Sequence, residues 1–388
     1  MNPASSGAST LRLTVARATA WALLLSGWVG LGAVALSLTP SLIEVYALVA
    51  LWLLALGIAA TIATRDGLSA GSRRVALGLC AAVTATTLVW STHGGGLPGL
   101  LVALAGWAGM TALASGVVRS VRLTQPARPG PPIVAASLGA LCAAIAIADP
   151  GNARDLSIRL AALVVVAAVV LALLQIGDRR GVAVSRCRAG LFDCSLPAWP
   201  AGAWRDAQQW PALLAGVAML PMMAALPMMI VWCRAQSIVP QEMVGLHFAA
   251  MFAPALLTRH AIGRWSPRVL STVCAVLLAA GAAAAIWASA PFDLLGVAFA
   301  HGAAWSLAWT GQLWSPDRRS RQGTSPLRAA LGYAVITLGV GAAVAQLGAT
   351  GLAITQAALG LVATLAWLYG LATGRQVAAE RMSGSAGP

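Results

Sequence analysis

The chain has 388 residues, of which 59% are hydrophobic and only 9% are charged, and its mean hydropathy is +0.81. A soluble domain does not carry so much apolar surface, so this composition predicts a helical integral membrane protein. The formal net charge is +14 and all 25 basic residues are arginine, but arginine in the loops between spans accounts for this excess without a nucleic-acid partner.

Apolar runs long enough to cross a bilayer recur twelve times along the chain. Six precede a polar stretch and cover residues 18–38, 42–63, 75–91, 96–118, 133–149 and 157–176. Six follow it and cover residues 211–233, 241–258, 268–289, 293–314, 327–347 and 350–371. We therefore predict an all-α membrane protein with 12 transmembrane helices, divided into an N-terminal half (1–176), a cytoplasmic linker (177–210) and a C-terminal half (211–388).

The arginines predict how these spans are oriented. When the N-terminus is placed in the cytoplasm, 22 of the 25 arginines lie on the cytoplasmic side, and the exceptions are Arg154, Arg159 and Arg234. Short cytoplasmic loops of membrane proteins are enriched in positive charge, so both termini are expected to be cytoplasmic. The first apolar run lacks a clear small-residue cleavage site, so we expect it to remain as the first span and not to act as a signal peptide.

Each half carries a basic segment directly after its second span. The first copy, RDGLSAGSRRV, covers residues 65–75, and the second, RHAIGRWSPRV, covers residues 259–269, about half the chain length later. Two six-span halves with such a loop resemble the major facilitator superfamily. The loop signature of that family is kept in part by Asp66, Gly71, Arg73 and Arg74, although the Asp-Arg order is reversed and the second copy has no acid. The resemblance implies a substrate site between the halves and alternating access by rocking.

The acidic residues all fall outside the middle of the predicted spans, and Glu44 is only just inside the second one. Charged side chains at mid-depth are costly and mark ion or proton pathways where they occur. Their absence disfavours a carrier of Mg, Mn, Fe or Zn ions, which prefer carboxylate or other hard ligands. It also disfavours proton symport driven by carboxylates, with Glu44 left as a peripheral candidate for proton coupling.

Residues 219–251 contain seven of the ten methionines and one of the four histidines. Met219 and Met223 are four residues apart in the seventh span, as are His247 and Met251 in the eighth, so each pair shares a helix face. At a rise of ~1.5 Å per residue, Met223 and Met251 lie at about the same depth, with His247 about one turn nearer the outer surface. Thioethers with one imidazole form a soft, uncharged ligand set that suits Cu(I).

The sequence therefore predicts a copper site formed by Met219, Met223, His247 and Met251. In this prediction Met223 and Met251 are the midplane ligands, His247 is the upper ligand and Met219 is the exit ligand. Possible accessory ligands nearby are Met222, Met228, Met229, Cys233 and Met243.

M-x-x-x-M in the seventh span with H-x-x-x-M in the eighth resembles the CcoA-type bacterial copper importers within the major facilitator superfamily. The matching residues are Met219 and Met223, then His247 and Met251, and Cys233 matches a cysteine that is associated with transport in that family. The resemblance implies a multi-pass protein of the bacterial inner membrane that imports copper, as Cu(I) or a complex, to supply cuproproteins such as cytochrome oxidase. Copper would be the transported substrate and not a prosthetic group, and the partners would be the lipid bilayer and a cytoplasmic copper acceptor.

Two other interpretations stay open. A major facilitator carrier of a small neutral organic solute would use the tryptophans of its cavity for stacking and the methionines as an adaptable lining. A membrane sensor or assembly scaffold would bind copper without moving it. An enzyme is not expected, because the cytoplasmic segments contain no nucleophile–base pair and no cofactor loop.

Overall fold

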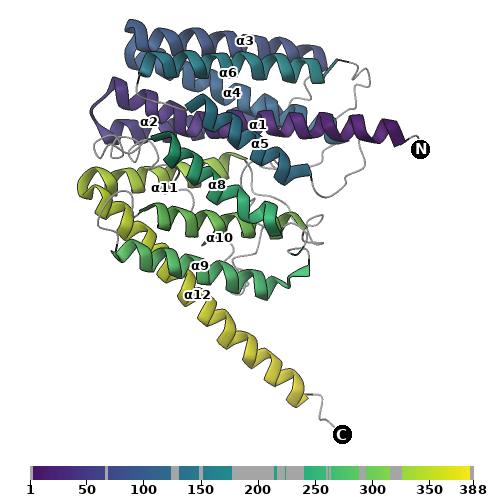
Figure 1. The fold of residues 1–388 in the computed structure, drawn as a ribbon, viewed down its shortest axis with the longest axis vertical. Coiled ribbons are helices and arrows are strands. Elements are labelled where there is room, and N and C mark those ends of the chain that lie inside the picture. Colours follow the sequence, from purple (N-terminus) through teal and green to yellow (C-terminus); the bar gives the residue numbers. More distant parts are fainter. Residues whose placement is uncertain are drawn as a thin grey trace.

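In the part of the chain that it describes, the computed structural model is helical (Figure 1). It describes residues 3–65, 69–123, 131–147, 152–176, 214–215, 223, 240–258, 261, 264–287, 294–314 and 326–384. The N-terminal half contains α1 (Pro3–Leu38), α2 (Leu42–Arg65), α3 (Ala70–Trp90), α4 (Gly96–Leu123), α5 (Pro131–Ile147) and α6 (Ala153–Leu174). The C-terminal half contains α8 (Pro240–Thr258), α9 (Pro267–Trp287), α10 (Leu294–Trp314), α11 (Pro326–Leu347) and α12 (Ala349–Gly384).

Seven helical stretches in the described part of the chain are long and apolar enough to cross a membrane, judged by length and composition. One of them, Ala70–Val121, holds both α3 and α4, which are joined by a π-helical turn at Ser91–Gly95. Two shorter apolar helices cover Val134–Ile147 and Val244–Thr258. The twelve predicted spans are therefore only partly tested. The seventh, at 211–233, lies outside the described residues except for positions 214, 215 and 223.

Local sequence explains where several helices begin and end. Proline is the first residue of α5, α8, α9 and α11, a position where its missing N–H is not needed and its fixed φ suits the helix. Ser69 caps α3, since its hydroxyl accepts a hydrogen bond from the Ser72 backbone N–H at 3.0 Å. Gly348 separates α11 from α12 with φ +58°, a left-handed conformation that glycine adopts without steric cost.

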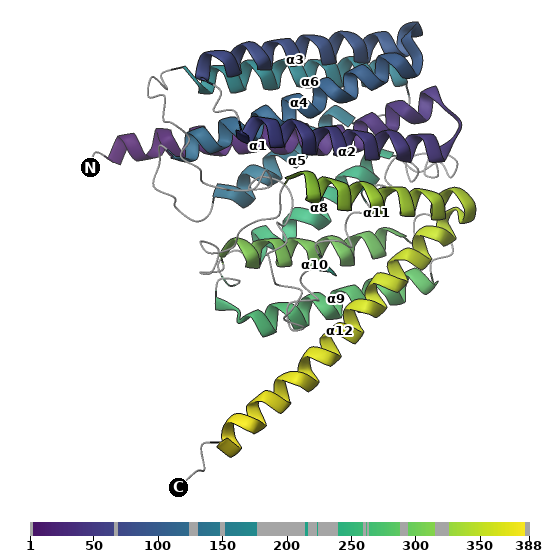
Figure 2. The same cartoon turned by 180° about the vertical axis from the view of Figure 1, so that it is seen from behind.

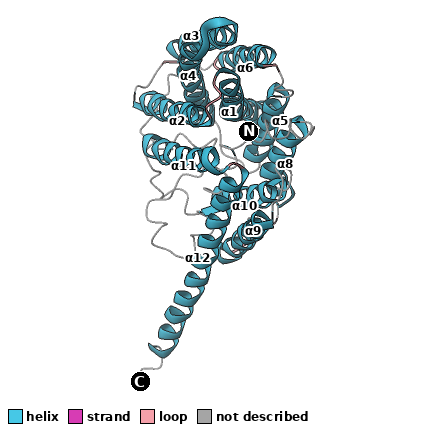
Figure 3. Ribbon diagram, turned by 90° about the vertical axis from the view of Figure 1, so that its left-hand side faces the viewer, coloured by secondary structure: helices cyan, strands magenta, loops and turns pink. Residues whose placement is uncertain are grey.

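The helices form two layers that correspond to the two halves of the chain, with α1–α6 in one and α8–α12 in the other (Figure 2). The layers meet where α2 lies along α11 and where α5 lies beside α8 (Figure 3). Small residues allow the first contact to be close: a Cβ built on Gly57 of α2 would collide with the Cβ of Ala330, and one built on Gly341 of α11 would collide with the ring of Tyr46. The antiparallel pair α2–α11 therefore joins the halves along most of its length. The predicted linker, 177–210, lies outside the described residues.

Arginine side chains gather at one end of the bundle and bind the ends of neighbouring helices. Arg12 of α1 donates to the carbonyl oxygens of Leu174 and Ile176 after α6, at 2.7 Å and 3.2 Å. Arg73 of α3 donates to the Gly116 carbonyl near the end of α4, at 3.3 Å. We call this the arginine-rich end. It is the end at which α1, α3, α9 and α11 begin and α2, α4, α6 and α8 terminate.

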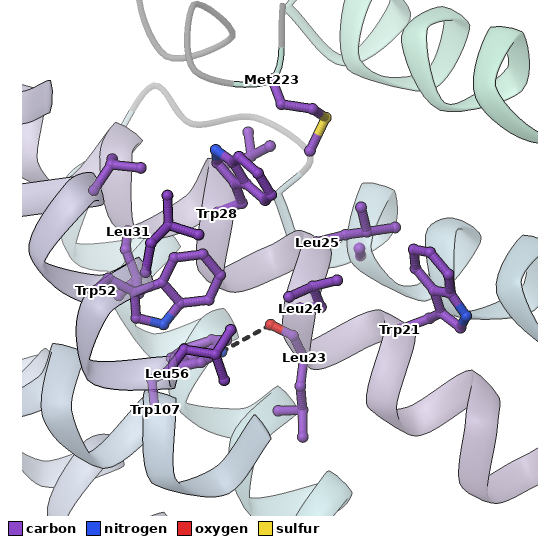
Figure 4. Close-up of a cluster of buried hydrophobic side chains, with 14 of the residues drawn as sticks. Trp21, Leu23, Leu24, Leu25, Trp28, Leu31, Trp52, Leu56, Trp107 and Met223 are labelled. Atoms are coloured by element: carbon purple, nitrogen blue, oxygen red, sulfur yellow. Dashed lines mark hydrogen bonds between the residues drawn. The ribbon is translucent and has the colours of Figure 1, made fainter. Parts of the chain in front are cut away.

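The core of the N-terminal half is built around three buried tryptophans (Figure 4). Trp28 of α1 and Trp52 of α2 meet edge to face, with ring centroids 6.1 Å apart. Trp107 of α4 donates its Nε1–H to the carbonyl oxygen of Leu23 in α1 at 2.8 Å. Gly27 makes this packing possible, because a Cβ built there would lie 2.7 Å from atoms of both Trp52 and Trp107. These contacts tie α1, α2 and α4 into one unit.

Candidate functional site

Two of the predicted copper ligands are in direct contact in the structure. Nε2 of His247 in α8 lies 3.3 Å from Sδ of Met223, and both side chains are buried. The Nδ1 atom of His247 has no hydrogen-bond partner in the described part of the chain. The pair can act in two ways. When Nε2 carries a proton, it donates a weak hydrogen bond to the thioether sulfur. When Nε2 carries no proton, its lone pair and the sulfur can both bind one ion.

This arrangement differs in register from the sequence prediction, which placed Met223 level with Met251 and His247 about one turn away. In the structure Met223 contacts His247, because a methionine side chain is long and flexible enough to span a helical turn of ~5.4 Å. Met251 is buried on the same face of α8, one turn beyond His247.

The remaining predicted ligands cannot be placed around this pair. Met219, Met222, Met228, Met229 and Cys233 lie outside the described residues. Met243 belongs to the first turn of α8, but its side chain also lies outside the described part. Within the described residues, no group of three or more His, Cys, Asp or Glu side chains could hold a metal ion.

The proposed proton-coupling residue Glu44 has a local structural partner. It lies in the first turn of α2, where its carboxylate accepts a hydrogen bond from the Thr39 hydroxyl. Its own backbone N–H donates to the Ser41 hydroxyl at 3.4 Å. These contacts are typical of a helix N-terminus, where negative charge and side-chain oxygens stabilise free N–H groups.

Pro254 interrupts the backbone hydrogen bonds of α8 about two turns beyond His247. Pro254 has no N–H, so the Ala250 carbonyl loses its helical donor. Gly302 of α10 packs against that carbonyl group: a Cβ built on Gly302 would lie 3.0 Å from the Ala250 carbonyl carbon. The Ala255 N–H in turn donates to the Ser306 hydroxyl of α10 at 3.1 Å. Helix α10 therefore packs against α8 at the point where its backbone hydrogen bonds are interrupted.

We expect Ser306→Ala to destabilise the protein by about 0.5–1.5 kcal/mol, since the buried hydrogen bond between the Ala255 N–H and the Ser306 hydroxyl would be lost. Thr310→Val is the matched control, because the Thr310 hydroxyl donates only within its own helix, to the Ser306 carbonyl at 2.7 Å. Unfolding of the purified proteins in mixed micelles, followed by circular dichroism, measures the difference. Equal losses in both variants would contradict the role given to Ser306.

A cluster of four aromatic rings joins the two halves on the arginine-rich side of His247. Trp21 of α1 contacts Phe252 of α8 and both Trp305 and Trp309 of α10, with ring centroids 5.6, 6.3 and 5.5 Å apart. Trp305 and Trp309 are stacked at 5.6 Å, and Phe252 meets Trp305 edge to face at 5.8 Å. All four side chains are buried. We refer to Phe252, Trp305 and Trp309 as the aromatic cage.

The sequence prediction mentioned cavity tryptophans only in general and did not find this cluster. The i, i+4 spacing of Trp305 and Trp309 indicates a shared helix face. No spacing within a helix could indicate that this face meets Trp21, which lies more than 280 residues earlier in the other half.

The His247–Met223 pair and the aromatic cluster lie at different distances from the arginine-rich end. Phe252 follows His247 by five residues on α8, so it lies about 7 Å nearer the arginine-rich end. The His247–Met223 pair therefore lies farther from the arginine-rich end than Phe252 of the aromatic cage.

Comparison with solved structures gives the fold class. The nucleoside transporter NupG matches with a TM-score of 0.63 and 18% sequence identity, over 94% of this chain and 98% of its own. The proton:xylose symporter XylE, bound to 6-bromo-6-deoxy-D-glucose, matches with a TM-score of 0.60 and 12% identity, over 93% of this chain and 95% of its own. XylE from E. coli in a partially occluded inward open conformation gives 0.59 and 11%, over 92% and 97% of the two chains.

These matches identify the fold of the chain as that of the major facilitator superfamily transporters. Comparison with protein-family models gave no match, and neither did comparison with curated protein sequences. At such low sequence identity, the likeness extends to the fold and not to the substrate.

Proposed function

We propose that this chain is a major facilitator transporter that carries a small, neutral organic solute across a membrane by alternating access. The observation that carries this proposal is a fold shared, over more than nine-tenths of the chain, with transporters of nucleosides and of xylose. This second interpretation of the sequence is better supported than copper import, because the matching transporters reported above carry nucleosides or xylose.

The chemistry between the halves supports a neutral solute. The cluster formed by Trp21 and the aromatic cage offers flat apolar faces, which stack on planar or ring-shaped solutes. Nδ1 of His247 is an uncharged hydrogen-bonding atom of the kind that orients a neutral ligand, while the buried Arg17 lies one turn before Trp21 on α1. Glu44 and Asp155 lie in the first turns of their helices, away from the aromatic cluster.

Uptake into proteoliposomes tests the proposal. We expect the purified protein to accumulate at least one radiolabelled solute from a panel of nucleosides, pentoses and hexoses, saturably and in competition with the unlabelled solute. Liposomes without protein provide the background. If no member of the panel enters above that background, while copper does, the proposal is wrong.

A second candidate function, import of Cu(I), is favoured by one specific observation, the 3.3 Å contact between His247 Nε2 and Met223 Sδ. A buried thioether and a neutral imidazole that meet in this way are soft ligands, which a monovalent soft ion prefers. The contact fits a copper ligand pair and equally fits a packed, hydrogen-bonded histidine, so uptake has to separate the two.

For copper import, we expect Met223→Leu and His247→Gln each to reduce uptake of radiolabelled Cu(I) into proteoliposomes at least tenfold, because each variant removes one soft ligand. Met110→Leu is the matched control, since Met110 is a fully buried methionine of α4 in the other half. Uptake that stays at the unmodified level in both ligand variants would rule out this site.

A further inference from the structure

We propose that Trp21 is a latch that holds the two halves together on the arginine-rich side, and that its departure from the aromatic cage opens the chain on that side. This latch goes beyond the proposed function, because it applies whichever substrate is carried. It gives one side chain of α1 a part in the closure, beside the α2–α11 and α5–α8 contacts.

The ring contacts of Trp21 cross to the opposite half. Its ring meets Phe252, Trp305 and Trp309 at interplanar angles of 85°, 84° and 78°, so it stands nearly perpendicular to all three rings of the cage. Edge-to-face contacts of this kind are favourable for aromatic rings. The three cage rings also contact one another and come from α8 and α10 of one half. The cage therefore stays assembled when Trp21 leaves.

Close packing behind Trp21 couples α1 to α5. A Cβ built on Gly139 of α5 would lie 2.5 Å from both the Ala18 carbonyl oxygen and the Trp21 Cβ, so α5 packs directly against α1 at this point. A movement of α1 away from α8 and α10 would therefore carry α5 with it, and it would take the Trp21 ring out of the cage.

The position of the latch determines which route it closes. Trp21 lies nine residues after Arg12, about 13 Å in from the arginine-rich end. Phe252 of the cage lies about 7 Å nearer that end than His247. The latch therefore acts between the arginine-rich end and the level of His247.

Distances between paired spin labels test the latch without any substrate. In a variant with the six native cysteines replaced, the pair Ser72→Cys and Ser266→Cys reports on the arginine-rich end, and His93→Cys with Thr350→Cys reports on the opposite end. All four labelled positions are exposed. We expect Trp21→Leu to increase the long-distance population of the first pair severalfold and to shorten the distances of the second pair.

Two further variants keep this test decisive. Trp309→Leu removes the same contact from the other half and should give the same shift, and combining it with Trp21→Leu should add little. Trp107→Leu removes an equally buried ring whose hydrogen bond stays within the N-terminal half, and should leave both distributions unchanged. Unchanged distances in folded Trp21→Leu and Trp309→Leu proteins, or an equal shift in Trp107→Leu, would overturn the latch. Since no substrate is present, failure of the uptake experiments would leave this result intact.

Discussion

Trp107→Ala is expected to lower the free energy of unfolding by about 3–5 kcal/mol, the range seen when a fully buried large aromatic ring is removed. The ring is completely buried against Gly27, and its Nε1–H donates to the Leu23 carbonyl at 2.8 Å. The variant would leave a cavity between α1, α2 and α4, and it would also remove a hydrogen bond worth about 1 kcal/mol. Unfolding of the purified protein in mixed micelles measures the loss.

Trp287→Ala is the matched control for this experiment. Trp287 ends α9 with 77% of its surface exposed, so its removal leaves no cavity. We expect a change of less than about 0.5 kcal/mol, as for most surface substitutions. If both tryptophan variants lose similar stability, the core described around Trp107 is incorrect.

Gly139→Ala is the second substitution for which we expect a large effect, a loss of about 1–3 kcal/mol from overpacking. The added methyl would lie 2.5 Å from a backbone oxygen of α1 and from the Trp21 Cβ, and neither can move without moving the helix. The strain acts directly on the segment that carries Trp21. In addition to lost stability, we expect the spin-label pair at the arginine-rich end to show a broader distance distribution.

For Gly78→Ala we expect a gain in stability, in contrast to the loss expected for Gly139→Ala. Gly78 lies inside α3 with nothing within 4 Å of a Cβ built there. Alanine is favoured over glycine in a helix by roughly 0.5–1 kcal/mol, so this variant should be slightly more stable than the unmodified protein. No loss of stability at Gly139 would contradict the α1–α5 packing, and a loss at Gly78 would contradict the open surroundings of Gly78 in α3.

The sequence predicted several helix boundaries closely, because the apolar runs end at strong local signals. The eighth span, expected at 241–258, is α8 at Pro240–Thr258, and the second, expected at 42–63, is α2 at Leu42–Arg65. The last span, expected at 350–371, agrees with the apolar stretch Thr350–Gly370. The helix α12 itself continues past this span to Gly384.

The candidate site was predictable only within single helices. The spacing of His247 and Met251 gives a shared face, and the antiparallel order of the spans brings Met223 near them. The depth of a residue estimated from the ends of its span carries an error of about one helical turn. Met223 was predicted to lie level with Met251, and in the structure it contacts His247, one turn away. The pairing of Trp21 with Trp309 depends on how two halves dock, and hydrophobic periodicity contains no information on that.

The aromatic cluster takes one ring from the N-terminal half and three from the C-terminal half, and this affects the balance between the closed and open conformations. Trp21 alone comes from the N-terminal half, so separation breaks three ring contacts and leaves the other two intact. At about 0.5–1.5 kcal/mol for each contact, closure is favoured by roughly 1.5–4.5 kcal/mol from this source. That corresponds to a closed-to-open ratio between about ten and about two thousand. A bound ligand that prefers the open form by a few kcal/mol can reverse such a ratio. The ring contacts of Trp21 are therefore strong enough to bias the empty protein towards the closed form and weak enough for one small molecule to offset them.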